Sequence, residues 1–143
     1  MTKATHPILD IPALHDFLQR AFPQVAADFE VLDVAPSHLS LRLVPGEQHL
    51  RPGGTVSGPS LFAMADCAVY LAIIAHVGEE ALAVTTNASM DFMRRPAADK
   101  DLRADVTLLK MGRSLVVGDV AIRNANEDAL VARATLTYSR PPS

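Results

Sequence analysis

The sequence has one cysteine, no tryptophan, few aromatic residues and no excess of basic charge. Cys67 has no partner for a disulfide within the chain, which excludes a disulfide scaffold and is typical of a reducing, cytoplasmic environment. Lys and Arg number 13 against 16 Asp and Glu, so the formal net charge is -3. Nucleic-acid-binding proteins usually present a basic field, and this charge balance argues against that class.

The chain also lacks an apolar run long enough to predict a membrane span. The most apolar stretch, residues 61–77, is 17 residues long and contains Asp66 and His76. A spanning helix needs about 20 apolar residues and tolerates a central carboxylate poorly. Residues 1–11 show no apolar run of signal-peptide length. We therefore expect a cytoplasmic protein that is not bound to membranes.

Small apolar residues are what the chain has in abundance. Of its 143 residues 49% are hydrophobic, and 22 are Ala. This share excludes a disordered chain, and the length suits one domain, residues 1–143. Because large apolar side chains are scarce, the elements must pack closely or share a core with a second subunit.

Residue patterns predict a helix, two strands, a long helix and four strands. The first helix is expected at about residues 10–22, capped by Asp10, with the remaining core at about 25–140. A Gly- and Pro-rich loop at 45–58 leads to a long helix that starts near Pro59 and stops at Gly78. Short later connections favour antiparallel hairpins, so the predicted architecture is α+β, with one antiparallel sheet wrapped around the long helix. The strands are expected at 29–34, 38–44, 83–93, 102–110, 114–123 and 129–139.

One carboxylate interrupts the apolar pattern of the long helix. Asp66 lies about two turns inside, with Phe62, Ala63, Val69 and Tyr70 at helical spacing, so no intrahelical salt bridge is available. Buried carboxylates are costly and are over-represented at reactive sites. Asp66 is therefore either a catalytic group or an acceptor of hydrogen bonds from a neighbouring segment.

The start of the same helix is the second candidate feature. Backbone N–H groups at a helix N-terminus attract negative charge, and Gly58 lets a ligand approach closely, although glycines alone also fit a plain flexible loop. Gly58 and Asp66 are eight residues apart, or about 12 Å along a helix, so one subunit cannot bring both to one carbonyl carbon. Two antiparallel copies of the helix could do so, and the site would then require a dimer.

Three segments, in order along the chain, resemble one known pattern: RPGGTVSGPSLFAMAD at 51–66, MDFMRRPA at 90–97 and LLKMGR at 108–113. Together they resemble the hotdog-fold acyl-CoA thioesterases of the phenylacetate-pathway (PaaI-like) type, over residues 25–140. The resemblance implies a hotdog fold that pairs into homodimers or homotetramers with a shared active site. It also implies hydrolysis of an acyl-CoA substrate without a metal or other cofactor.

The resemblance further implies roles for individual residues. Asp66 matches the acid that serves as general base or nucleophile, and Gly58 matches the glycine whose N–H polarises the thioester carbonyl. Thr85, or Thr86 one residue on, matches the hydroxyl residue that holds the water. Simple alternation would place Thr85 on the polar face of its strand, with Asn87. The pantetheine and phosphates would lie against Arg94, Arg95, Lys110 and Arg113.

The helix start departs from the pattern of many relatives. Where they carry His-Gly-Gly, this chain has Ser57-Gly58-Pro59, and where they carry a carbonyl-binding Asn or His it has Arg51 and Pro52. The Ser57 hydroxyl could substitute for the missing group. The departures keep open a non-catalytic acyl-CoA-binding or structural hotdog protein. A hotdog hydratase or dehydratase is disfavoured, because no His stands near Asp66 at the helix start.

The remaining reactive residues carry no clear site. The five His residues form no close pair at metal-ligand spacing, so no metal site is expected, although His49 could line a pocket. Cys67 adjoins Asp66 but points about 100° away from it on a helix. We expect a buried, inert thiol.

Overall fold

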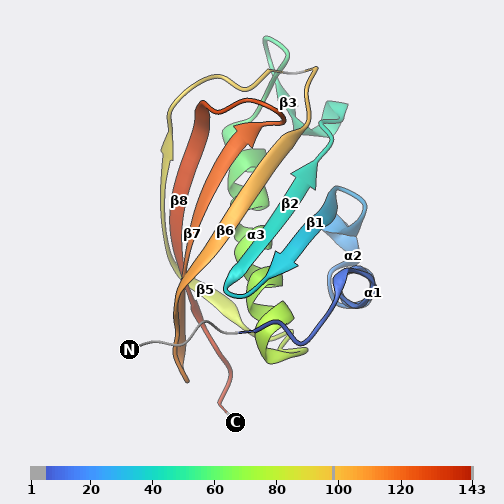
Figure 1. The fold of residues 1–143 in the computed structure, drawn as a ribbon. Helices are drawn as coiled ribbons and strands as arrows, with labels where there is room; N and C mark the ends of the chain where they lie inside the picture. The colour runs from blue at the N-terminus through green and yellow to red at the C-terminus, as the bar shows by residue number, and fades with distance from the viewer. Residues whose placement is uncertain (1–5, 98, 143) are drawn as a thin grey trace.

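The computed structural model describes residues 6–97 and 99–142, and a long helix, α3 (Gly58–Val77), forms its centre (Figure 1). A six-stranded antiparallel sheet in the order β1-β2-β6-β7-β8-β5 curves around α3. The predicted α+β architecture is confirmed. The strands are β1 (Phe29–Ala35), β2 (His38–Leu43), β5 (Val84–Phe92), β6 (Leu102–Met111), β7 (Leu115–Asn124) and β8 (Leu130–Ser139).

Local signals fix both ends of α3. The Ser57 hydroxyl accepts a hydrogen bond from the Ser60 N–H at 3.2 Å and so caps the first turn. Gly78 ends the helix with a φ of 95°, a backbone conformation that favours glycine. By length and composition α3 could cross a membrane, with a mean hydropathy of 1.8, but 72% of that window is buried inside the protein. This burial is the state expected of a core helix.

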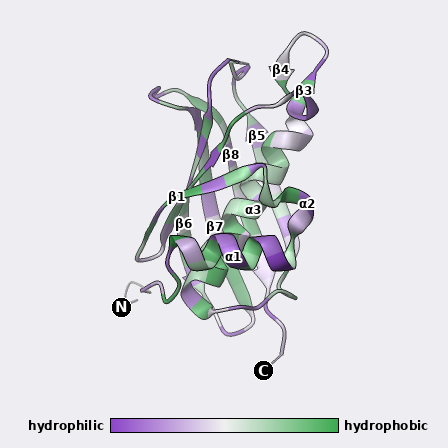
Figure 2. Cartoon of the chain, turned by 90° about the vertical axis from the view of Figure 1, so that its right-hand side faces the viewer, coloured by the Kyte–Doolittle hydropathy of each residue, from purple (hydrophilic) through white to green (hydrophobic). Residues whose placement is uncertain are grey.

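Two short helices cover the C-terminal part of α3 from the side opposite the sheet. The first, α1 (Ile11–Ala21), is capped by the Asp10 carboxylate, which accepts the Ala13 N–H at 3.0 Å. Its buried side carries Leu14, Phe17 and Leu18, and its hydrophilic side faces outward (Figure 2). A four-residue helix, α2 (Pro23–Ala26), follows at once. The N-terminal helix predicted from the sequence is confirmed.

The N-terminal part of α3 is less well covered. Phe62 and Ala63 are exposed, and Asp66 is half-buried, whereas residues 67–76 are all buried. The beginning of α3 therefore presents an apolar strip that the chain's own sheet and helices leave open. Apolar residues occupy nearly every side of this helix, and the structure shows that those near its N-terminal end are the ones left exposed to solvent.

The strand β5 contains a bulge that changes which side chains face α3. Thr85 pairs with Tyr138 while Asn87 pairs with Thr137, so Thr86 is an extra residue without its own partner. The bulge turns Thr85 toward α3, on the side that Ala88 also faces. The prediction that strict alternation places Thr85 on the face of Asn87 was wrong, because the bulge breaks the two-residue period.

Residues 45–58, predicted to have little regular structure, are more ordered than that. They contain a 3-10 helix, η1 (Glu47–His49), and a small hairpin of β3 (Leu50–Arg51) and β4 (Thr55–Val56). His49 holds this segment together: its Nδ1 accepts the Gly46 N–H at 2.8 Å and its carbonyl accepts the Ser57 N–H at 2.8 Å. These hydrogen bonds therefore fix the direction in which the chain enters α3.

The close contact between α3 and the sheet at Gly118 yields a stability prediction. A Cβ atom added at Gly118 would meet the two γ-methyl groups of Val69 at 3.0 and 3.1 Å. Gly118→Val should therefore destabilise the fold by about 1–3 kcal/mol through overpacking, as measured by urea unfolding. Ala121→Val, on the outer face of the same strand, is the control and should cost much less. Equal stability of both variants would contradict tight α3–β7 packing.

Candidate active site

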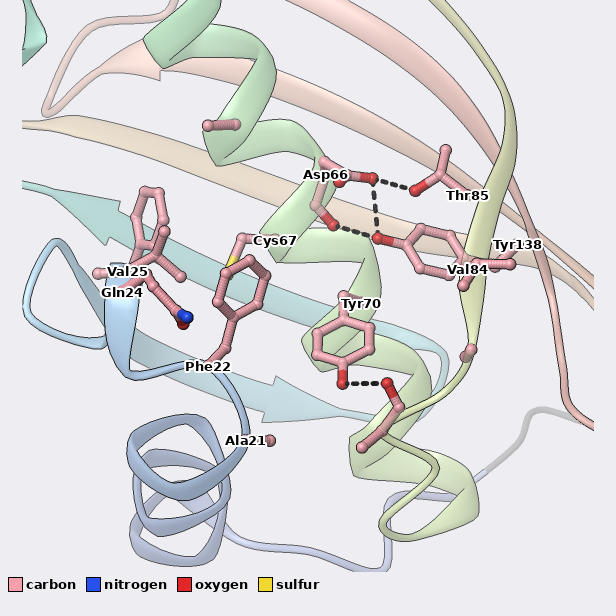
Figure 3. Close-up of a pocket in the computed structure, with 14 residues that line it drawn as sticks. Ala21, Phe22, Gln24, Val25, Asp66, Cys67, Tyr70, Val84, Thr85 and Tyr138 are labelled. Atoms are coloured by element: carbon pink, nitrogen blue, oxygen red, sulfur yellow. Dashed lines mark hydrogen bonds between the residues drawn. The ribbon is translucent and has the colours of Figure 1, made fainter.

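Asp66 is held by hydroxyl groups from two strands (Figure 3). Its Oδ1 atom accepts a hydrogen bond from Thr85 Oγ1 at 2.6 Å and another from the Tyr138 hydroxyl at 2.8 Å. The same Tyr138 oxygen lies 3.1 Å from the Asp66 backbone carbonyl. Within the described chain no hydrogen bond reaches Oδ2. One carboxylate oxygen is thus fixed, and the other is free for a water or a substrate.

The two hydroxyl donors reach Asp66 for different reasons. The β5 bulge aims Thr85 at α3, and Tyr138 lies directly opposite Thr85 on β8. Burial, and then the nearby Asp66 charge, raise the pKa of the Tyr138 phenol well above its ordinary value. Tyr138 therefore stays protonated at neutral pH and remains a hydrogen-bond donor. Thr86, the alternative considered from the sequence, instead donates to the Thr137 carbonyl at 3.3 Å.

Asp66 faces a cavity of about 450 Å³ between α3, the start of β5 and the α1–α2 segment. Four aromatic rings contribute to its wall, those of Phe22, Phe29, Tyr70 and Tyr138. The Tyr70 hydroxyl donates to the Ala81 carbonyl at 3.0 Å, which fixes the connection from α3 to β5 beside the cavity. No pattern in the sequence predicts this cavity, because most of its walls come from residues distant in sequence from Asp66.

Cys67 also lines this cavity, but its thiol is not poised for reaction. Only 7% of the residue is exposed, and burial raises the pKa of the thiol far above its ordinary value. A thiol that stays protonated at neutral pH is a poor nucleophile. This agrees with the expectation of an inert cysteine.

Gly58 lies apart from Asp66, in a shallow depression of about 210 Å³. Three arginines, Arg51, Arg94 and Arg95, line the same depression. Ser57 does not line it. The Ser57 hydroxyl also donates to the Ser60 hydroxyl at 3.1 Å, in addition to capping the helix. The structure therefore groups Gly58 with positive charge, and separates it from the carboxylate and its hydroxyl partners.

The four basic residues singled out in the sequence fall into two groups within one chain. Arg94 and Arg95 follow the end of β5, next to the start of α3. Lys110 lies near the end of β6 and Arg113 in the turn to β7, where Met111 is in register with Val116. That turn is at the opposite end of the sheet, beside the start of β5. A single chain does not bring the four side chains together.

Two further candidates lie outside this arrangement. His49 is buried and borders a separate cavity of about 400 Å³, with its Nε2 atom 3.4 Å from the Asp28 carboxylate. It does not border the Asp66 cavity. Among the described residues no group of three His, Cys, Asp or Glu side chains could hold a metal ion.

Comparison with known proteins assigns the family. The sequence profile of the thioesterase superfamily matches residues 53–131, which include both Gly58 and Asp66. The chain belongs to the thioesterase superfamily. Its sheet wrapped around one central helix is the hotdog fold of that superfamily, and the chain is a thioester hydrolase.

Relatives of this thioesterase support the assignment over nearly the whole chain. It is 48% identical to a crystallised "putative thioesterase" of Silicibacter sp. TM1040, with a TM-score of 0.89 over 98% of this chain and 97% of that one. A mutant of the phenylacetic acid degradation protein PaaI from Thermus thermophilus is 28% identical, with a TM-score of 0.71 over 83% of this chain and 99% of that one. A "Putative esterase" of Deinococcus radiodurans is 30% identical over 110 residues, which are 77% of this chain and 73% of that protein.

Tyr138 is the site residue that sequence reasoning missed, and it can be tested directly. Tyr138→Phe should lower kcat for thioester hydrolysis about ten- to a hundredfold, since a hydrogen bond to a charged group contributes about 1.5–3 kcal/mol. Tyr70→Phe is the matched control, because it removes a hydroxyl from the same cavity without touching Asp66. If both variants lose activity equally, the Tyr138 contact with Asp66 has no special role.

Proposed function

We propose that this thioesterase hydrolyses acyl-CoA at a site shared by two copies of the chain. Asp66 of one copy acts on a thioester carbonyl that the Gly58 N–H of the other copy holds. The observation that carries the proposal is the separation of the two features: they lie on one helix but border different hollows. The cavity at Asp66 contains the proposed base, and the depression at Gly58 contains the N–H group proposed to hold the thioester carbonyl.

The surface between the two hollows is suited to a second copy. β5 lies at the end of the sheet, so one of its edges is unpaired. Phe62, Val84, Phe92 and Met93 expose large apolar side chains along β5 and the start of α3. A second chain added antiparallel at this edge would extend the sheet and run its α3 opposite to the first. The start of each α3 would then approach the middle of the other, in a homodimer or a homotetramer.

The chemistry follows from the free oxygen of Asp66. A water bound at Oδ2 gives its proton to the carboxylate while its oxygen attacks the thioester carbonyl carbon. The carbonyl electron pair moves onto oxygen, where the Gly58 N–H and the N-terminal end of α3 stabilise the negative charge. When the carbonyl re-forms, the C–S bond breaks and the thiolate takes the proton from Asp66. Alternatively, Oδ2 attacks the carbonyl carbon itself, the C–S bond breaks and the thiolate leaves. Water then hydrolyses the mixed anhydride to the free acid and the Asp66 carboxylate, and the proton released in that step neutralises the thiolate.

The basic residues support coenzyme A as the leaving group. Arg94 and Arg95 lie beside Gly58, and in an antiparallel pair Lys110 and Arg113 of the second chain would come to the same end. Such a group would bind the phosphates of coenzyme A. A Streptococcus mutans protein of the same fold was solved with acetyl-CoA bound; it is 23% identical, with a TM-score of 0.71 over 79% of this chain and 88% of that one.

The first test addresses the carboxylate. Asp66→Asn keeps the shape and the hydrogen bonds of the side chain but removes the base, so acyl-CoA hydrolysis should be abolished. Free thiol release across a panel of acyl-CoA substrates measures this, and size-exclusion chromatography should show an unchanged oligomer. A variant that hydrolyses at the wild-type rate would remove Asp66 from the mechanism. Binding of acyl-CoA by the wild-type protein without any turnover would instead support a non-catalytic binder.

The second test addresses the sharing of the site. Gly58→Pro removes the N–H at a helix position that proline tolerates, while Gly58→Ala adds a Cβ only 3.7 Å from the Phe92 ring, an ordinary contact, and should stay active. Gly58→Pro and Asp66→Asn subunits should each be inactive alone. Mixed in equal amounts by co-refolding, they should regain about a quarter of the wild-type activity, because half of the dimers are mixed and each mixed dimer has one intact site of two. No recovery on mixing would show that each chain works alone.

A further inference from the structure

The size and lining of the cavity beside Asp66 restrict which acyl groups can bind there; this inference rests on the proposed acyl-CoA hydrolysis. Asp66 opens on this cavity rather than on bulk solvent alone, so the acyl part of a thioester attacked there has to occupy it. Its volume of about 450 Å³ lies within the usual range of small-molecule sites, about 300–1,000 Å³. The cavity is therefore large enough to select among acyl groups.

The charge of the cavity wall restricts the acyl group. No Lys, Arg or His is among the described residues that line it, and Asp66 is the only carboxylate. A carboxylate at the far end of an acyl chain would lose its hydration there without gaining a cation, and it would add negative charge to a hollow that already contains Asp66. The aromatic and Ala side chains of the wall instead favour apolar groups.

One wall of the cavity comes from a part of the chain outside the segment that matches the superfamily. The match covers residues 53–131, whereas Phe22, Gln24 and Val25 belong to the α1–α2 segment. Figure 3 shows Phe22 and Val25 facing Cys67 on α3, across the cavity from β5. This wall thus lies outside the part of the chain that carries Asp66, Gly58 and the superfamily match.

The backbone of Phe22 explains how its ring reaches the cavity. Phe22 ends α1 and precedes α2, with φ -143° and ψ 59°, which bends the chain between two helices. Its N–H donates to the Leu18 carbonyl at 2.8 Å, so the bend is anchored. Pro23 is the first residue of α2, and its ring restricts the backbone conformations that are open to the chain at this bend. The backbone is therefore fixed at Phe22, whose side chain is 42% exposed and lies at the rim of the cavity.

We propose that the substrates are CoA thioesters of uncharged, apolar acyl groups of medium size, and that Phe22 sets the upper limit of their length. The acyl chain enters beside Asp66, lies along the aromatic wall and ends against the α1–α2 segment. Groups with a terminal carboxylate are excluded because none of the described residues that line the cavity is a cation. Acetyl groups leave most of the cavity unfilled.

A pair of substrates of equal chain length tests the charge rule. Hexanoyl-CoA and adipoyl-CoA differ only in the terminal carboxylate of the latter, and hexanoyl-CoA should have a kcat/KM at least about a hundredfold higher. Acetyl-CoA should also be a poor substrate. Equal hydrolysis of the matched pair would overturn the proposed substrate class while leaving the acyl-CoA thioesterase activity itself established. No hydrolysis of any CoA thioester would overturn both.

Variants at Phe22 test the length rule. Phe22→Ala should raise the kcat/KM ratio of decanoyl-CoA to hexanoyl-CoA about tenfold, and Phe22→Trp should lower it, because a methylene group gained or lost in an apolar pocket changes this ratio by at least about tenfold. Leu109→Ala is the control, since Leu109 is 59% exposed and does not line the cavity. An unchanged ratio in both Phe22 variants, with melting temperatures like that of the wild type, would remove Phe22 from this role.

Discussion

The position of one carboxylate halfway along an apolar helix constrains the rest of the site. Asp66 pairs with no cation among the described residues, and an unpaired charge in a half-buried position would be costly. Two hydroxyl groups from neighbouring strands, those of Thr85 and Tyr138, offset that cost by donating to a single oxygen. The arrangement stabilises the charge without neutralising it. Asp66 thus keeps an oxygen that is available for chemistry.

The same helix sets a distance that the chain cannot shorten. Because α3 is one continuous helix from Gly58 to Val77, its start and its middle cannot meet around one small group. The unpaired edge of β5 and the exposed apolar side chains at the N-terminal end of α3 lie between these two points. In the proposed mechanism a second copy resolves both problems at once, since it covers apolar surface and supplies the missing half of the site.

Much of the fold and part of the site could be predicted from the sequence. The strands were predictable from their alternating residues and α3 from its long apolar run between Pro59 and Gly78, and Asp66 stood out because it interrupts that run. The orientation of Thr85 was not predictable from alternation, because a bulge depends on pairing with β8. Tyr138 was missed because an aromatic residue at an inward position of an alternating strand predicts an ordinary core side chain. The cavity wall at Phe22 depends on how α1 and α2 pack, which no local pattern encodes.

The extra residue in β5 has a consequence for how such a strand can change. Beyond the bulge, Ala88 pairs with Leu136 and faces the α3 side of the sheet by ordinary alternation, whereas Thr85 faces Asp66 because Thr86 has no partner of its own on β8. Loss of that one residue would straighten the strand and turn Thr85 toward the outer face, while the pairing with β8 from Ala88 onward stayed in place. The strand thus has two parts: the residues from Ala88 onward keep a regular pairing with β8, and the residues before the bulge place Thr85 beside Asp66. A change of one residue in length could separate the fold from its chemistry.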